Sequence, residues 1–429
     1  MPTSPSLKNL NQYKAPDGGW GWVIVFGSFM VSVIGDGFSY TTGLFYAEFL
    51  REYGESETVT SLFDSIMTGT IYCIGPVASG LTTTYGCRKI AILGSILATG
   101  GMVASTILDS IYTHCLTLGL ITGMGLGFLY LPQVMIVTYW FDKHLSLATG
   151  ISVCGSGIGI AIFALLSEKL LNVFNSWKSA MLLLASIMFT CVGFSSLFRK
   201  VDYMQEKSDL KSALKETFNF KIFKDGVFIY FAIANFLNGS VFYVPIIFLK
   251  DHVVKTHIGT DAEAVQLLVY FGLSNAFGRA FFGYVADFQS LNRIVMYGLS
   301  IISYGVAIAL MASFGTQYIY MIVWVVMFGL SEGAFITLSS VVLVDLFGMD
   351  RVTNVFGIIN LIAGMASFIG PPLIAKTFDK VTGYTTGFYI TSMLTIFSGL
   401  MLLMLPLIHK SLDNVWTKKQ TDIEENVKK

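Results

Sequence analysis

Long apolar stretches recur along almost the whole chain, and they constrain the fold more than any other feature. Each is about 20 residues or longer, which is enough for a helix to cross the ~30 Å hydrocarbon layer of a bilayer. Hydrophobic residues make up 54% of the chain and charged residues only 13%, which is unlike a soluble protein. The sequence therefore predicts an integral membrane protein made of helices, because helices satisfy their own backbone hydrogen bonds in lipid.

The polar breaks between apolar stretches predict twelve spans, six on each side of a central polar segment. The first six are expected near residues 21–48, 58–84, 90–109, 113–140, 146–170 and 177–198. The last six are expected near residues 226–249, 264–287, 293–314, 317–345, 352–376 and 384–408. The predicted domains are an N-terminal segment (1–20), an N-terminal six-helix bundle (21–198), a linker (199–225), a C-terminal six-helix bundle (226–408) and a C-terminal tail (409–429).

Basic residues gather in the termini, the linker and the loops on the same side, which predicts that both termini are cytoplasmic. We expect a multi-pass protein of the plasma membrane. A weak internal repeat supports two related halves. "GLTTTYGCRK" after the second span resembles "GYVADFQSLNR" after the eighth, and "WFDKHLSLATG" resembles "LFGMDRVTNVFG". Two such halves are typical of a rocking transporter, although similar turn chemistry also arises by chance.

Other classes of protein find little support. Net charge is zero, so no nucleic-acid partner is expected. The cysteines and histidines lack metal-ligand spacing, and the glycine-rich runs lack GxGxxG, so we expect no metal and no cofactor. No HExxH or GxSxG motif supports an enzyme. A channel and a non-transporting receptor on the same scaffold stay open as alternatives.

Arg279 and Glu332 are charged residues inside the predicted eighth and tenth spans. An arginine at this depth costs about 3 kcal/mol to insert, so it should face a wet cavity and meet a partner or an anionic ligand. Its planar guanidinium fits a carboxylate. Glu332 could hold the cationic group of a zwitterion; the alternative is that it neutralises Arg279 in an internal ion pair. An arginine that reaches to the membrane surface is a further alternative.

The first predicted span contains further polar candidates. Asp36, with Asp64 of the second span, is a candidate proton carrier, and the alternative is a hydrogen-bonded acid that lines a cavity. Tyr40, Phe45 and Tyr243 are aromatic candidates to reach that cavity. In "YKAPDGGWGWVIVFGSFMV", Asp17 is expected to cap the first helix, with glycines that allow close approach and tryptophans at the headgroup layer.

The motif "DGGWGW" resembles the first-helix signature of the monocarboxylate transporter family, within the major facilitator superfamily. "WFDKHLSLATGISVCGSGIG" resembles the family's second signature, although His144 and Leu145 stand where two arginines are usual. The matching positions are Phe141, Lys143, Leu147, Ala148, Gly150, Gly155 and Gly159. "GPP" in the eleventh span and the span of Arg279 also resemble the family. The resemblance implies an all-helical, twelve-span fold of two pseudo-symmetric six-helix bundles that moves a small organic carboxylate.

Arg279 matches the family's substrate-anchoring arginine. Proton-coupled members carry an aspartate one turn earlier, where this chain has Asn275, and a lysine that ungapped alignment places at Tyr40. Proton symport is thereby in doubt, and a proton-independent carrier of a zwitterion such as an amino acid, creatine or carnitine is the alternative. The family also permits a co-transported proton and a single-span accessory glycoprotein as partners in the lipid bilayer.

Asp142, Lys143 and Asp287 are the predicted residues of a cytoplasmic gate. Asp142 and Lys143 lie between the fourth and fifth spans, and Asp287 ends "GYVAD", which resembles the superfamily's motif at that loop. That motif implies a breakable clasp between an acid and helix ends of the other half. The first half has Thr84 where the acid is expected, so one clasp should be weaker. The alternative is ordinary loop charges.

Overall fold

The computed structural model describes residues 15–55, 57–201, 220–288, 291–315, 317–375, 377 and 384–427, and their regular secondary structure is entirely helical. Residues 1–14 of the predicted N-terminal segment and residues 202–219 of the predicted linker lie outside these ranges. The elements of the first half are α1 (Trp20–Tyr53), α2 (Glu57–Cys73), α3 (Gly75–Tyr85), α4 (Cys87–Ile107), α5 (Ile111–His114), the π-helix η2 (Cys115–Thr122), α6 (Gly123–Trp140), α7 (Leu145–Phe174), α8 (Trp177–Phe189) and α9 (Cys191–Ser195).

The second half begins with a short 3-10 helix and continues through seven α-helices of the described chain. These elements are η3 (Phe220–Lys224), α11 (Gly226–Val241), α12 (Val244–Lys255), α13 (Asp261–Val285), α14 (Arg293–Phe314), α15 (Tyr318–Phe347), α16 (Met349–Ala375) and α17 (Thr385–Val427). Several begin at residues that suit a helix start. Asp225 caps α11, Asn292 caps α14, and Thr260 forms a capping box with Glu263 at α13.

The observed helices follow the predicted spans closely, with two kinds of difference. The second, sixth and seventh spans are each divided into two helices, at Ile74, at Thr190 and at residues 242–243, and the fourth contains the π-helix η2. In the second and seventh spans a proline is the second residue of the following helix, because proline fits the first turn but lacks the N–H that a continuous helix needs. The predicted tail from residue 409 is continuous with α17, which runs to Val427 because no glycine or proline interrupts it after Pro406.

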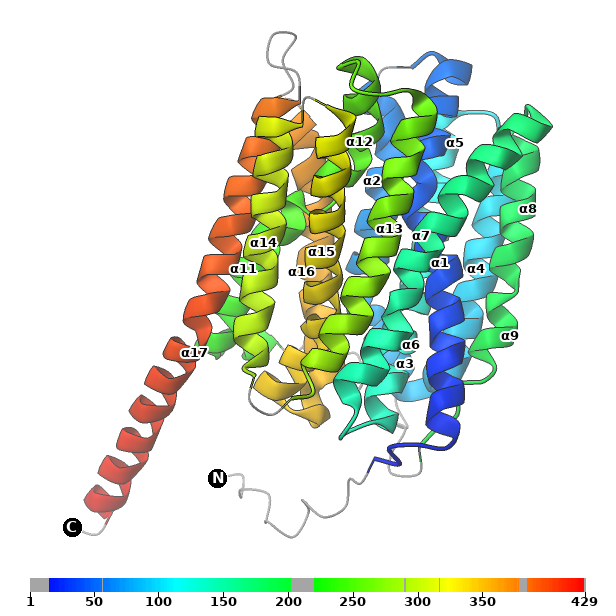
Figure 1. Ribbon diagram of the computed structural model, residues 1–429. Helices are drawn as coiled ribbons and strands as arrows, with labels where there is room; N and C mark the ends of the chain where they lie inside the picture. The colour runs from blue at the N-terminus through cyan, green and yellow to red at the C-terminus, as the bar shows by residue number, and fades with distance from the viewer. Residues whose placement is uncertain are drawn as a thin grey trace.

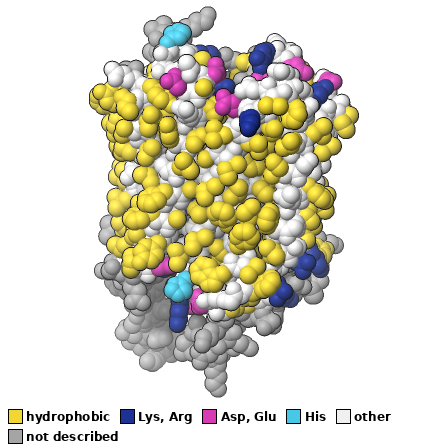
Figure 2. Space-filling model, turned by 45° about the vertical axis from the view of Figure 1, so that its right-hand side comes forward, with side chains coloured by type: hydrophobic (Ala, Val, Ile, Leu, Met, Phe, Trp, Pro, Cys, Tyr) yellow, Lys and Arg dark blue, Asp and Glu magenta, His cyan; other side chains and the backbone are white. Residues whose placement is uncertain are grey.

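Ten helical segments of the described chain are long and apolar enough to cross a membrane. Together with α2–α3 and α13, which run alongside them, they make up the twelve spans (Figure 1). On the face shown in Figure 2, hydrophobic side chains cover the middle and charged side chains gather at the two ends. This band of apolar surface fits the hydrocarbon layer. The start of α1 and the end of α17 lie at the same end of the molecule, which we call the terminal side (Figure 1).

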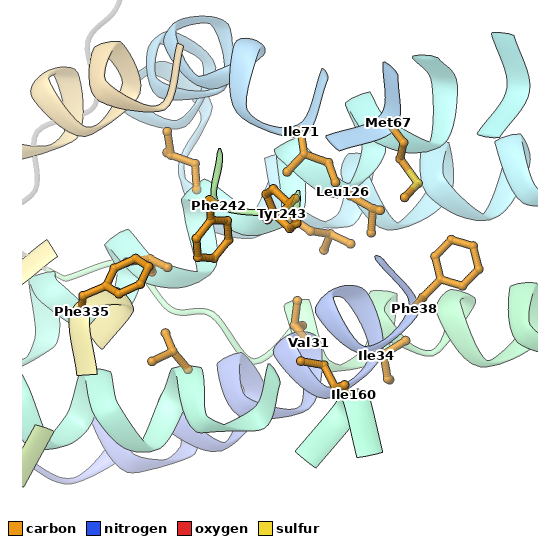
Figure 3. Close-up of a cluster of buried hydrophobic side chains, with 14 of the residues drawn as sticks. Val31, Ile34, Phe38, Met67, Ile71, Leu126, Ile160, Phe242, Tyr243 and Phe335 are labelled. Atoms are coloured by element: carbon orange, nitrogen blue, oxygen red, sulfur yellow. The ribbon is translucent and has the colours of Figure 1, made fainter. Parts of the chain in front are cut away.

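The two halves meet along two pairs of helices. In one pair α7 lies along α13, and in the other α2 and α3 lie along α16. The fifth span therefore faces the eighth, and the second faces the eleventh, as two pseudo-symmetric bundles require. Between these pairs, side chains of α1, α2, α6 and α7 converge with Phe242, Tyr243 and Phe335 of the second half (Figure 3). The candidate site lies in this central region.

Candidate functional site

Arg279 lies in the interior of the molecule, where α13 of the second half packs on α7 of the first. Its side chain is 2% exposed. Nε donates to Asn275 Oδ1 (2.6 Å), and Nη1 donates to the Val153 carbonyl and to Ser156 Oγ (2.9 Å each). Nη2 donates to no acceptor among the described residues. The guanidinium thus spans both halves with one amino group left for another acceptor, rather than reaching to the membrane surface.

Ser156 connects Arg279 to the acid of the first helix. Its hydroxyl donates to Asp36 Oδ2 while it accepts from Arg279 Nη1. No ion pair with N···O within 4.0 Å joins Arg279 to a carboxylate of the described residues. Asp36 on α1 and Arg279 on α13 are therefore linked by hydrogen bonds to the same serine of α7. The sequence pattern missed Ser156, because a serine in "GSGIG" looks like one more small packing residue.

Glu332 lies on α15, fully buried, and it pairs with a tyrosine instead of Arg279. Tyr40 Oη donates to Glu332 Oε1 (3.2 Å), and this contact again crosses between halves. An internal Arg279–Glu332 ion pair, one of the alternatives above, is absent from the described contacts. The two helices are nonetheless close, because a Cβ on Gly333, the residue after Glu332, would lie 2.8 Å from the backbone nitrogen of Arg279. The backbones that carry Glu332 and Arg279 therefore lie in the same layer of the site.

Two buried polar atoms in this layer have no hydrogen-bond partner among the described residues. They are Asn275 Nδ2, a donor, and Glu332 Oε2, an acceptor. An unpaired buried polar atom costs about 1–3 kcal/mol, and folded proteins mostly avoid it. A polar ligand that reaches both atoms and Arg279 Nη2 would therefore gain binding energy from groups already held in place.

A small cavity adjoins this layer between the halves. Its lining includes Asp36 and Tyr40 of α1, and Tyr243, which lies beside Ile71 and Leu126 (Figure 3). Tyr40 and Tyr243 thus reach the cavity, whereas Phe45, the third aromatic candidate, is fully buried and does not line it. Four tyrosines contribute to the lining: Tyr40, Tyr72, Tyr130 and Tyr243. The hydroxyls of Tyr72 and Tyr243 are 2.6 Å apart and bridge the two halves.

Asp64, the other candidate proton carrier, has a different environment. It is buried on α2, where Thr42 Oγ1 donates to its Oδ1 (2.5 Å). Both residues belong to the first half, and Asp64 does not line the cavity. The structure therefore brings Asp36, but not Asp64, together with Arg279.

Asp287 bridges the halves at the terminal side. Its carboxylate accepts from the backbone nitrogens of Ser146 (3.2 Å) and Leu147 (3.0 Å), at the start of α7, and lies 3.6 Å from Arg293. A carboxylate at a helix N-terminus is stabilised by the unpaired N–H groups there. Thr84 instead donates to the Gly80 carbonyl of its own helix. The acid-to-helix contact is thus present in one half and replaced by a local bond in the other.

Asp142 and Lys143, the other gate candidates, have exposed side chains, and their backbone nitrogens donate to Asp17 Oδ1 (2.8 and 2.9 Å). The expectation that Asp17 caps α1 is therefore wrong, because the N-cap is Gly19 and has no side-chain hydrogen bond. The opening motif instead ties the start of α1 to the α6–α7 loop. Among the motif's glycines, Gly18 and Gly19 have nothing within 4 Å of an added Cβ, whereas a Cβ on Gly21 would meet the Phe141 ring at 3.0 Å.

Residues 24–288 and 231–426 match the family described as Major Facilitator Superfamily. Monocarboxylate transporter 4 of Gallus gallus is 30% identical, and the match covers 91% of this chain and 83% of that protein. Monocarboxylate transporter 2 of Homo sapiens is 28% identical over 90% of this chain and 84% of its own length. Among solved structures, the human organic anion transporter MFSD10 (TETRAN) superposes with a TM-score of 0.72 over 89% of this chain and 99% of that chain, at 12% identity.

Proposed function

Because the chain belongs to the monocarboxylate transporter family of the major facilitator superfamily, we propose that it carries a small organic carboxylate across the membrane by alternating access. Its relatives are transporters, so the chain is a membrane transporter and not an enzyme. Rocking of the two bundles exposes the central site first to one side of the membrane and then to the other. The substrate is bound between them, near the middle of the bilayer.

Arg279 anchors the substrate carboxylate in this proposal, and its unused Nη2 is the observation that carries it. The residue is almost fully buried, and Nη2 donates to no described acceptor. A buried guanidinium without a carboxylate partner is costly, so an anionic ligand is favoured at this place. Asn275 Nδ2 is a second unpaired donor on the same helix. Together they offer donors to both oxygens of one carboxylate.

A zwitterionic substrate is the second candidate, and Glu332 favours it. Among the described residues its buried Oε2 has no partner, and Tyr40 is the one group that bonds its other oxygen. An ammonium or guanidino group beside the anchored carboxylate would pair with Oε2, while the tyrosine rings of the cavity would face a quaternary ammonium group. Amino acids, creatine and carnitine have this chemistry.

The orientation follows from the basic residues, and the membrane and the partner follow from the family. The basic residues support cytoplasmic termini, and we place the protein in the plasma membrane on the family resemblance. In that orientation the contact between Asp287 and α7 closes the cytoplasmic side. A single-span accessory glycoprotein stays a prediction from the family.

Purified protein in liposomes tests the proposal. A thermal-shift screen against lactate, pyruvate, ketone bodies, amino acids, creatine and carnitine should identify ligands, which are then followed as labelled uptake. Arg279→Ala should abolish saturable uptake, and Arg279→Lys should retain little of it because the planar fork is lost. Arg51→Ala is the control, since Arg51 is exposed and pairs only with Glu48 of its own helix among the described contacts. Unchanged uptake by Arg279→Ala would falsify the anchor.

A further inference from the structure

The Asp36–Ser156–Arg279 contact joins an acid and a base that lie on opposite sides of the moving interface. Asp36 belongs to α1 and Ser156 to α7 of the first half, and Arg279 belongs to α13 of the second. Ser156 is fully buried, and its single hydroxyl serves both charged groups. Asp36 Oδ1 has no hydrogen bond to a described residue, and Asp36 lines the cavity. An acid in this position can reach both Arg279 and water entering the site.

We propose that Asp36 is the counter-charge of Arg279 in the empty transporter and that it takes up the proton that accompanies each carboxylate. This inference rests on the proposed function. It assigns proton coupling to α1, although the family's aspartate is replaced by Asn275 on α13 and its lysine by Tyr40.

The argument is one of charge balance. With the site empty, ionised Asp36 and Arg279 offset each other through Ser156. An arriving carboxylate adds a negative charge at low dielectric, which is costly unless another charge is removed. A proton from water on the loading side binds Asp36 and forms an O–H bond, so the substrate carboxylate replaces Asp36 as the partner of Arg279. On the other side the carboxylate leaves and Asp36 returns the proton to water. One proton crosses with one carboxylate, and no net charge moves.

The other titratable groups in and near the cavity leave few competitors. Four tyrosines line it: Tyr40 on α1, Tyr72 on α2, Tyr130 on α6 and Tyr243 between α11 and α12. Outside the lining, Glu332 on α15 is bonded by Tyr40, and Cys191 on α9 lies within electrostatic reach of Asp36. Tyrosine and cysteine side chains are neutral near pH 7, so only Glu332 could carry the proton in place of Asp36. Glu332 is 0% exposed and is not part of the cavity lining, whereas Asp36 is. Geometry therefore favours Asp36.

Two transport modes of the same liposomes separate proton coupling from binding. Counterflow with equal pH on both sides measures exchange of substrate and needs no net proton movement. Accumulation driven by a more acidic exterior measures coupling, and 1:1 coupling predicts about tenfold accumulation per pH unit. The probe is whichever compound of the panel above shows uptake that depends on Arg279. Asp36→Asn should retain counterflow and lose accumulation, because asparagine resembles the protonated acid but binds no proton.

A second variant guards against misfolding. Ser156→Ala removes the bridge and leaves both charged residues in place. It should lower accumulation more than it lowers counterflow, and it should also shift the pH profile of uptake. Asp64→Asn is the matched comparison, since it removes a buried acid of the same half that has no described contact with Arg279. It should keep the accumulation.

The outcomes are distinct. Accumulation that survives in Asp36→Asn overturns the assignment. If Asp64→Asn or Glu332→Gln abolishes accumulation in that case, the proton carrier is that residue instead. Wild-type uptake that ignores the pH gradient also overturns it, while leaving Arg279 as the anchor. Absence of Arg279-dependent uptake for every compound overturns the proposed function and this inference with it.

Discussion

At the scale of single residues, the hydrogen-bond partners of Glu332 and Arg279 determine which of their atoms are left for a ligand. They lie on neighbouring helices, yet Glu332 is bonded by Tyr40 and Arg279 by α7. Each keeps one atom without a described partner, Oε2 in one case and Nη2 in the other. A simple carboxylate would use only Nη2, whereas a zwitterion, the second candidate, would use both atoms.

Glu332→Gln tests the zwitterion candidate. The neutral amide cannot balance an ammonium group, so affinity for amino-bearing compounds should fall by about 1.5–3 kcal/mol, which is roughly tenfold to a hundredfold. Affinity for simple carboxylates should change much less, because Arg279 holds them. Thermal shift and uptake across the panel measure both, with Glu52→Gln as the control because Glu52 is exposed at the end of α1. Equal losses for both classes would remove the zwitterion candidate.

Residue-level prediction from the sequence succeeds where a residue type contradicts its surroundings. Arg279 and Glu332 stand out because charges are costly inside apolar stretches. Ser156 does not stand out, since its importance comes from a partner in the other half. Asp17 was misassigned for a related reason. An acid before a helix suggests a cap, and only the fold brings the α6–α7 loop close enough for its backbone N–H groups to donate to this carboxylate.

At the scale of the helix, α7 is shaped by glycines that face two different neighbours. A Cβ on Gly155 or Gly159 would come within 2.3 Å of a carbonyl oxygen of α1. A Cβ on Gly157 would lie 2.4 Å from the Ala276 nitrogen of α13, and one on Gly150 would lie 2.7 Å from the Arg279 carbonyl. Small residues let helices pack closely in a membrane. The glycines of the second signature thus set the distance at which α7 can bond Arg279.

Gly157→Val should prevent this approach. The added atoms overlap the backbone of α13, which cannot move aside as a flexible side chain can. The free energy of unfolding should therefore fall by about 1–3 kcal/mol. The loss should appear as a lower unfolding temperature and a smaller monodisperse fraction in detergent. Gly193→Ala is the control, because a Cβ there meets nothing within 4 Å and alanine favours a helix. Equal stability of the two variants would contradict the packing argument.

The sequence predicts the membrane-spanning helices well because the length of each apolar stretch is visible directly in the sequence. The breaks in the second and seventh spans were not predicted, although Pro76 and Pro245 were visible. Proline is tolerated in membrane helices when neighbours satisfy the freed backbone groups, so its presence alone does not place a break. The predicted end of the twelfth span, near residue 408, agrees with the apolar segment Thr385–Pro406, and α17 continues beyond it because a change to polar composition marks the end of a span and not of a helix.

At the scale of the whole molecule, hydrogen bonds join the two halves at the terminal side, where we propose that they close the transporter. Tyr139 Oη lies 2.5 Å from Thr353 Oγ1, and Ser79 Oγ donates to the Thr353 carbonyl at 3.2 Å. Asp287 adds its contacts with the start of α7. The sequence predicted two halves and an acid at this loop. It could not predict the closed state, because the relative population of two arrangements depends on small differences among such contacts.

Asp287→Asn should weaken this closure. The neutral amide loses the attraction between a carboxylate and the α7 N-terminus, which is worth about 1–2 kcal/mol when partly buried. That loss shifts the balance between closed and open states by roughly 5- to 30-fold, and backbone amides near the start of α7 and the end of α13 should exchange with deuterium faster by a similar factor. Asp109→Asn is the control, because Asp109 is exposed and pairs with Lys178.

Since Thr84 supplies no acid to the corresponding loop, Asp287 has no counterpart there to compensate for its loss. Unchanged exchange at these amides would mean that the Tyr139 and Ser79 contacts close this side without the acid.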